Sequence, residues 1–263
     1  MGYVISLLKE IVAKRKLILD LAKADFKKRF AGSYFGIAWM FLQPLATVLV
    51  YFCVFQLGFK STPPVDYPYV LWLIPGIVPW FFFSEVLNGG TNCLQEYNYL
   101  VKKMAFQVEM LPIIKMLSCF MVHAIFLVIM IVVFLCYGIA PRISWIQILY
   151  YSFACSMLSL ALTYFTSAIN VFFKDMAQIV GILLQFGMWL VPIMWAPEML
   201  PGAPAWLNPF YYIVAGYRDS MLTGDGFWMR PTLGVYFWVA TLALMLIGLK
   251  VFKKLRPHFS DVL

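Results

Sequence analysis

Six long apolar stretches run through this chain of 263 residues, and they constrain its fold more than any other feature. Hydrophobic residues make up 63% of the sequence and charged residues only 12%, which is far from the composition of a soluble globular domain. A helix of ~20 residues crosses the hydrocarbon core of a bilayer, and each stretch is close to that length. The six predicted spans are Tyr34 to Phe59, Tyr69 to Leu87, Ile113 to Tyr137, Trp145 to Phe173, Ile179 to Trp195 and Leu233 to Val251.

None of these stretches alternates between apolar and polar residues with a period of two, so we expect helices and not a barrel. The predicted fold class is an all-α polytopic membrane protein with six transmembrane helices. Residues 1–33 are expected to form a cytoplasmic amphipathic interface helix, and residues 34–263 the six-span domain.

The basic residues predict the orientation. Threading six spans places sixteen of the twenty Lys and Arg residues on one side, before the first span, in the second and fourth connections and at the end. Only Lys60, Arg142, Arg218 and Arg230 fall on the other side. Because cytoplasmic loops are enriched in Lys and Arg, both termini are predicted to be cytoplasmic.

The segment before the first span has helical periodicity of its own. Leu19, Ala22, Phe26 and Phe30 recur at spacings of three and four residues and fall on one helical face. Such a helix lies in the membrane interface, or the segment is simply a basic tail that sets the topology. In the first case it touches an anionic lipid headgroup or a cytoplasmic partner. The candidate headgroup residues are Lys23, Lys27, Lys28, Arg29 and Phe30.

Three connections are long or polar enough to carry function. Residues 88–112 are expected to leave the membrane with a short helix, and residues 170–178 contain the charged pair Lys174 and Asp175. These two cytoplasmic loops form a natural docking surface for a partner. On the outer side, residues 196–232 begin with prolines and continue as the apolar segment 210–222, which we interpret as a re-entrant or surface-lying helical pair.

Catalytic motifs are missing from the sequence. No Gly-Lys dipeptide occurs, so there is no phosphate-binding loop, and we expect no nucleotide hydrolysis by this chain. His123 and His258 cannot form a metal or catalytic cluster. Ionisable residues within a membrane usually mark ion or proton paths, and the candidates here are Glu85 and His123. For both we favour the alternative, a helix-packing polar residue. The five cysteines have no metal-ligand spacing and are interpreted as small core residues.

Aromatic residues make up 18% of the sequence and are ordered in the first span. They fall within one narrow helical face, and Trp189 adds a further ring in the fifth span. Two interpretations stay open: the rings face lipid and neighbouring helices, or they line a passage in which flat faces contact sugars without fixing register. The candidate channel residues are Tyr34, Phe41, Phe52, Phe55, Phe59 and Trp189.

Five segments, taken in order, resemble the permeases of type-2 ABC exporters for polysaccharides, O-antigens, capsules and teichoic acids. The resemblance covers nearly the whole chain. The matching segments are FKKRFAGSYFGIAWMFLQP at Phe26 to Pro44, PGIVPWFFFSE at Pro75 to Glu85, NYLVKKMAFQVEMLPI at Asn98 to Ile113, FFKD at Phe172 to Asp175 and NPFYYIVAGYRD at Asn208 to Asp219.

The resemblance implies a transporter subunit and not an enzyme. It implies a homodimer in the bacterial cytoplasmic membrane, paired with two separate ATP-binding subunits, that exports a lipid-linked glycan or teichoic acid. ATP and Mg²⁺ would be bound by the partner, so no cofactor, metal or nucleic acid is expected on this chain. The alternatives are efflux of drugs or small lipids by the same fold, and a non-transporting membrane scaffold or enzyme.

The resemblance also implies roles for particular segments. The helix ending near Phe30 would be a gate or interface helix, and Lys174 to Met176 the second of two coupling helices. The exit would be capped by residues 208–222, with Tyr217, Arg218 and Asp219 at the gate. The first coupling helix would include Asn98, Leu100, Lys102, Lys103 and Phe106.

Overall fold

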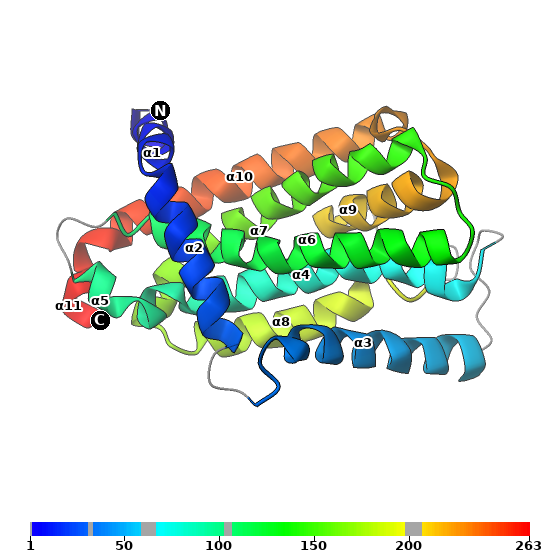
Figure 1. Ribbon diagram of the computed structural model, residues 1–263. Helices are drawn as coiled ribbons and strands as arrows, with labels where there is room; N and C mark the ends of the chain where they lie inside the picture. The colour runs from blue at the N-terminus through cyan, green and yellow to red at the C-terminus, as the bar shows by residue number, and fades with distance from the viewer. Residues whose placement is uncertain (1, 31–33, 59–66, 103–106, 198–206) are drawn as a thin grey trace.

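The computed structural model describes residues 2–30, 34–58, 67–102, 107–197 and 207–263, and every regular element in these ranges is helical (Figure 1). Long helices run side by side and form a bundle. They are α3 (Trp39–Tyr51) with the π-helical turn η2 (Phe52–Gly58), α4 (Tyr69–Glu96), α6 (Met110–Cys136), α7 (Gln147–Phe172), α8 (Met176–Leu190) and α10 (Pro231–Leu255). The remaining α-helices are α1 (Gly2–Ala13), α2 (Arg15–Phe30), α5 (Asn98–Val101), α9 (Pro209–Arg218) and α11 (Phe259–Val262).

Five helical segments are long and apolar enough to cross a membrane. They correspond to the first four predicted spans and the sixth. Their bounds are Gly36–Gly58, Tyr69–Glu96, Met110–Cys136, Ile143–Phe172 and Pro231–Val262. The second is longer than the predicted span ending at Leu87, because α4 continues to Glu96 with Thr91, Cys93 and Leu94 buried.

The fifth predicted span coincides with α8, which has only 15 residues. At 1.5 Å per residue this helix is ~22 Å long, less than the ~30 Å of hydrocarbon. It ends at Leu190 because Val191 precedes Pro192 and adopts an extended conformation, as residues before proline do. The chain then turns inward, where Val191 and Ile193 are fully buried. The fifth predicted span, and with it the total of six crossings, therefore stays a prediction.

The core of the bundle lies along α4 and α7. These two helices are mostly buried, whereas α3 lies at the edge and has one buried residue, Met40, among those of its side chains that the structure describes. Small residues allow close contact at the centre: Gly90 of α4 lies against Thr163, and Gly248 of α10 lies against the backbone of Ala161. This is the usual way in which apolar helices associate without water.

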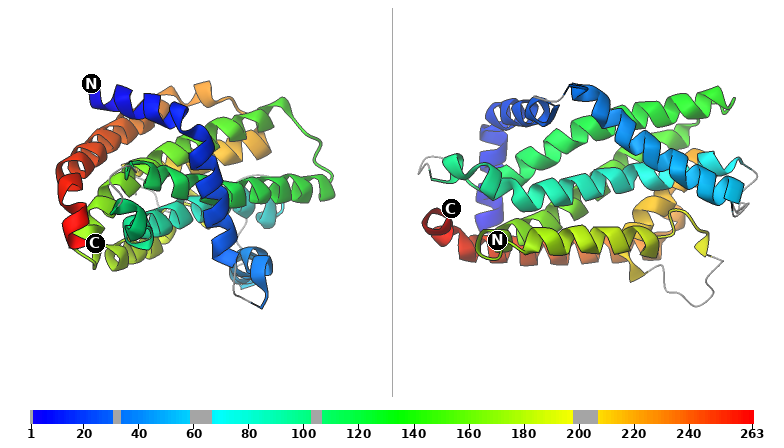
Figure 2. Two further views of the ribbon diagram at one scale, coloured as in Figure 1. Left: turned by 60° about the vertical axis from the view of Figure 1, so that its left-hand side comes forward. Right: turned by 90° about the horizontal axis from the view of Figure 1, so that it is seen from below.

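The two chain ends, α1, α2, α5 and α11 all lie at one end of the bundle (Figure 1). There α2 crosses α4 and α6 at a steep angle, and α1, which precedes it in the chain, meets it at a bend (Figure 2). A helix across the end of a bundle is the position expected of an interface helix. The pair of termini at one end is consistent with an even number of crossings.

The segment predicted to be re-entrant contains α9 followed by the π-helical turn η6 (Asp219–Thr223). Pro209 occupies the first helical turn, and the side chain of Asn208 accepts a hydrogen bond from the Phe210 amide, which caps the helix. Almost all of α9 is buried, near the bundle end opposite α2 (Figure 1). The prolines Pro201 and Pro204 lie outside the described residues.

Candidate functional site

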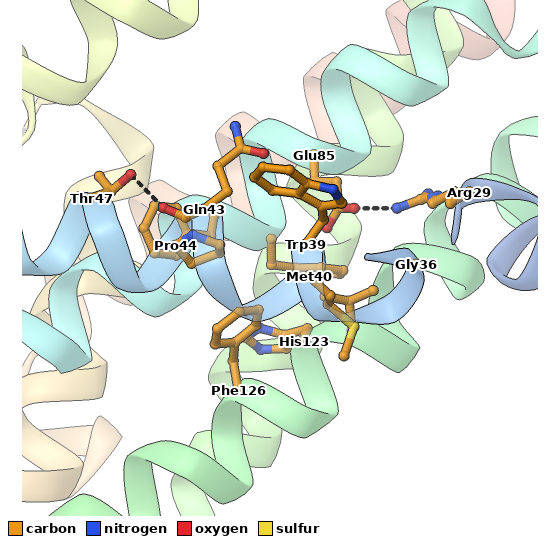
Figure 3. Close-up of a pocket in the computed structure, with 13 residues that line it drawn as sticks. Arg29, Gly36, Trp39, Met40, Gln43, Pro44, Thr47, Glu85, His123 and Phe126 are labelled. Carbon is orange, nitrogen blue, oxygen red and sulfur yellow. Dashed lines mark hydrogen bonds and ion pairs between the residues drawn. The ribbon is translucent and has the colours of Figure 1, made fainter. Parts of the chain in front are cut away.

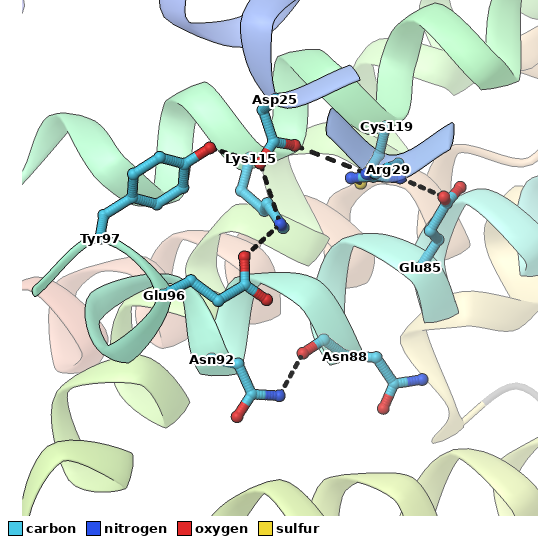
Figure 4. Close-up of polar contacts among 9 residues, drawn as sticks. All are labelled: Asp25, Arg29, Glu85, Asn88, Asn92, Glu96, Tyr97, Lys115 and Cys119. Carbon is cyan, nitrogen blue, oxygen red and sulfur yellow. Dashed lines mark hydrogen bonds and ion pairs between the residues drawn. The ribbon is translucent and has the colours of Figure 1, made fainter. Parts of the chain in front are cut away.

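A network of charged side chains fastens α2 to the bundle (Figure 4). Asp25, which is 2% exposed, accepts hydrogen bonds from the Tyr97 hydroxyl at 2.6 Å and from Lys115 Nζ at 3.1 Å. Lys115 also donates to Glu96 at 2.7 Å. Arg29 lies 3.5 Å from Asp25 and pairs with Glu85. The network thereby joins α2 to both α4 and α6.

Each charge in this network is compensated, which its burial requires. A buried carboxylate without a partner would be strongly unfavourable. Burial alone would raise the pKa of Asp25, but Lys115 and the hydrogen bond from Tyr97 outweigh it and hold this pKa below its usual value. Asp25 is therefore ionised, and it links α2 to Tyr97 and to Lys115 of α6.

The predicted headgroup residues divide between two faces of α2. Lys23, Lys27 and Lys28 are on the exposed face, and Lys28 Nζ lies 5.5 Å from the centre of the Tyr97 ring. Arg29 instead points into the bundle. The buried face of α2 consists of Ile18, Ala22 and Asp25. Leu19, which the sequence places on the apolar face, lies beside this face and is exposed. The side chain of Phe30 lies outside the described residues.

A cavity of about 480 Å³ opens beside Arg29, between α3, α4 and α6 (Figure 3). Its walls combine the Arg29 and Glu85 ion pair with Gln43 and Trp39 of α3 and with His123 of α6. His123 Nε2 lies within hydrogen-bond distance of Ser152 and of Tyr217, at 3.2 and 3.0 Å. His123 thus packs between helices, as the sequence predicts. It also lines the cavity.

The predicted channel residues do not share one surface. Phe41 packs against Phe126 and Phe55 stacks on Tyr69, with ring centres 6.4 and 6.1 Å apart, so both rings contact helices of their own subunit. Phe52 is half-buried. Tyr34 is almost fully exposed, and Trp189 is about half exposed. Phe59 lies outside the described residues.

The predicted coupling residues lie at the same end of the bundle as α2. Asn98 and Leu100 are in α5, Lys102 follows it, and Lys174 and Asp175 form an exposed turn before α8. Lys103 and Phe106 lie outside the described residues.

Asn170, which the sequence did not single out, links the ends of helices next to the two predicted coupling segments. Its side-chain amide donates to the Thr91 carbonyl at 3.0 Å and accepts from the Ala177 amide at 3.2 Å. Its backbone carbonyl accepts from Gln95. One asparagine therefore ties the end of α4, which leads into α5, to the turn between α7 and α8.

The predicted exit residues are buried. Tyr217 is within 2.6 Å of Ser152, and Arg218 donates to the carbonyls of Trp72, Pro192 and Ile193. The Arg218 guanidinium also lies 3.5 Å from the centre of the Trp72 ring. Asp219 pairs with Arg230 at 2.8 Å. Arg218 thus satisfies carbonyl groups left free where α8 ends, and it holds α9 in place.

Comparisons with known proteins agree on one family. The model of the ABC-2 type transporter family matches residues 17–222, a range that includes the charge network, the cavity and α9. The O-antigen export system permease protein RfbA of Klebsiella pneumoniae is 27% identical, over 94% of this chain and 95% of that protein. RfbA of Myxococcus xanthus is 28% identical, over 81% and 83% of the two chains.

A further relative is the polysialic acid transport protein KpsM of Escherichia coli, which is 21% identical over 87% of this chain and 89% of that protein. Each of these relatives covers more than four fifths of this chain. Since the family model matches well over half of the residues, this chain belongs to the ABC-2 type transporter family.

Proposed function

We propose that the chain is the permease subunit of an ATP-driven exporter that moves a lipid-linked polysaccharide, or a teichoic acid, from the cytoplasm to the outer face of the bacterial cytoplasmic membrane. The observation that carries this proposal is the likeness, over almost the full chain, to permeases named for O-antigen export and to a polysialic acid transport protein. A bundle of membrane-length helices is what such a subunit requires.

The energy for export comes from a separate ATP-binding subunit, of which two copies serve a homodimer of this chain. ATP and Mg²⁺ are bound by that partner. It docks on α5 and on the turn at Lys174 and Asp175, whose positions at one end of the bundle support this role. Asn170 links the two segments, so a push on either one moves α4 and α7 together.

The exposed face of α2 receives the anionic headgroup of the cargo. Lys23, Lys27 and Lys28 are free to contact a phosphate at the membrane surface, where each basic residue contributes about 1 kcal/mol. Arg29 is already shared between Asp25 and Glu85, so it positions the helix, and the anionic headgroup of the cargo is bound by the lysines.

The test is export by vesicles that contain this chain together with its ATP-binding subunit. We expect lipid-linked glycan to stimulate ATP hydrolysis and to reach the opposite leaflet, whereas hydrophobic drugs do neither. Stimulation by drugs alone would assign the subunit to small-molecule efflux. Hydrolysis with no movement of either compound would remove the transport function.

The docking surface is tested in the same preparation by charge reversal. Lys102→Glu combined with Lys174→Glu is expected to lower recovery of the ATP-binding subunit with this chain about tenfold, the effect of ~1.4 kcal/mol. Lys9→Glu, an exposed reversal on α1 outside both loops, is the control and is expected to leave recovery unchanged. Equal recovery with both variants would place the partner elsewhere.

A further inference from the structure

His123 lines the cavity beside Arg29 and carries a buried polar atom without a partner. His123 is 2% exposed, and its Nδ1 atom has no hydrogen-bond partner among the described residues. Its other ring nitrogen is engaged by Ser152 and Tyr217. A buried polar atom without a partner is costly, and it is rare unless a ligand or water completes it. A hydrogen-bonding occupant of this cavity, reached by a small turn of the ring, would satisfy the Nδ1 atom.

A second cavity of about 270 Å³ adjoins the first and differs from it in character. The two share Pro44, Phe81 and Phe126, and every side chain that lines the second is apolar, including Ile129 and Val133. Taken together they form a groove that is polar next to α2 and apolar further along α3. This order matches a lipid whose headgroup lies at the bundle end that carries α2.

The charges at the polar end indicate the kind of headgroup. Arg29 and Glu85 form an ion pair in the cavity wall, and the Glu85 side chain is 37% exposed. Arg29 also faces Asp25, so the site has no surplus positive charge for a bare phosphate or diphosphate. A zwitterionic headgroup can lie antiparallel to the ion pair, with its ammonium group at Glu85 and its phosphate at Arg29.

We propose that this groove binds one phospholipid with an ethanolamine headgroup. The ammonium group donates hydrogen bonds to Glu85 and to the Gln43 side-chain oxygen, and His123 Nδ1 donates to an ester carbonyl. One acyl chain follows the apolar cavity toward Val133. The groove lies between α3, α4 and α6 of one subunit and is far too small for a polymer, so its lipid is a constituent of the subunit and not the cargo. The bundle end that carries α2 is the predicted cytoplasmic end, so the lipid belongs to the cytoplasmic leaflet, and only this assignment rests on the proposed orientation.

The test measures lipid retention by native mass spectrometry on the intact chain, purified from membranes in a mild detergent and titrated with single lipids. One phosphatidylethanolamine per subunit is expected to bind about tenfold more tightly than phosphatidylcholine, because a trimethylammonium group cannot donate hydrogen bonds. Phosphatidylglycerol, which has no ammonium group, is also expected to bind more weakly. Equal affinity for the three lipids, or no retained lipid, would overturn the proposal.

Two neighbouring valines offer a matched pair of variants. Val133→Trp fills the apolar cavity and is expected to abolish retention, whereas Val132→Trp places the same ring on the exposed side of α6 and is expected to preserve it. Gln43→Leu removes one hydrogen bond at the exposed polar end of the groove. It is expected to weaken the binding of phosphatidylethanolamine about tenfold.

Retention that is unchanged in Val133→Trp overturns the proposal. If Val133→Trp is not recovered as a folded chain, Gln43→Leu decides, and unchanged affinity in that variant overturns it. Because retention is measured without transport, a negative result leaves the proposed export function standing. A failed export assay in turn leaves this site intact.

Discussion

At the scale of single residues, the fold depends on charges placed in apolar surroundings. Asp25, Arg29 and Lys115 come from two helices and meet in one network with Glu85 and Glu96 of α4. The sequence could suggest that Glu85 is buried within a span, but it could not show its partner. Arg29 is 56 residues away along the chain, and spacing alone carries no information about such a distance.

We predict that Asp25→Asn and Lys115→Met each destabilise the subunit by about 3–5 kcal/mol, because each leaves a buried charge without its main partner. The double variant is expected to be less damaging than the sum of the two, since both charges are then gone. Thermal unfolding of the detergent-purified chain measures the loss of stability in the two single variants and in the double variant. Additive losses in the double variant would show that the two residues do not interact.

At the scale of elements, the five long helices follow from hydropathy, whereas the ends of α4 and α8 do not. Polar residues from Asn88 onward suggested that the second span ends at Leu87. In the structure Asn92 and Gln95 are both hydrogen-bonded to Asn170 of α7, so α4 continues to Glu96. Partners that lie more than seventy residues away decide this boundary.

Glycine in α10 sets how closely α7 and α10 approach. A Cβ atom on Gly248 would lie 2.6 Å from the Ala161 carbonyl oxygen, a backbone atom that cannot move aside. Gly181 in α8, in contrast, has open space around it. The contact of α7 with α10 therefore tolerates no side chain at position 248.

We predict that Gly248→Leu destabilises the subunit by about 3 kcal/mol or more, because the two helices must separate. Gly181→Leu adds the same side chain where nothing is displaced, and it is expected to change the unfolding temperature little. Differential scanning fluorimetry of both variants compares them directly. A similar loss in both would mean that leucine itself, and not the helix contact, is responsible.

At the scale of the whole molecule, both chain ends and both predicted coupling segments gather at one end of the bundle (Figure 1). Charge counting predicts this arrangement, because sixteen of the twenty basic residues fall on one side of a six-span threading. What it could not predict is that Arg218, counted on the other side, is buried and bonded to three carbonyl groups.

We predict that cysteines placed at the two chain ends react with a membrane-impermeant thiol reagent only after the cells are opened. A cysteine in the connection between α6 and α7, at Pro141, is expected to react in intact cells. The parent should carry the five native cysteines as serine or alanine, so that only the introduced thiol is labelled. Labelling of either end in intact cells would reverse the orientation on which partner docking depends.

The edge position of α3 has a consequence for how such a machine changes shape. Few of its side chains are enclosed by its own subunit, and one flank borders a groove and not a packed core. If α3 moved away from the other helices, little protein surface would be newly exposed. Lipid could cover that surface as well as α3 does. The first crossing is therefore the least enclosed of the five candidate spans in the described part of the chain, and it is the one that can shift with the smallest loss of contacts inside the subunit.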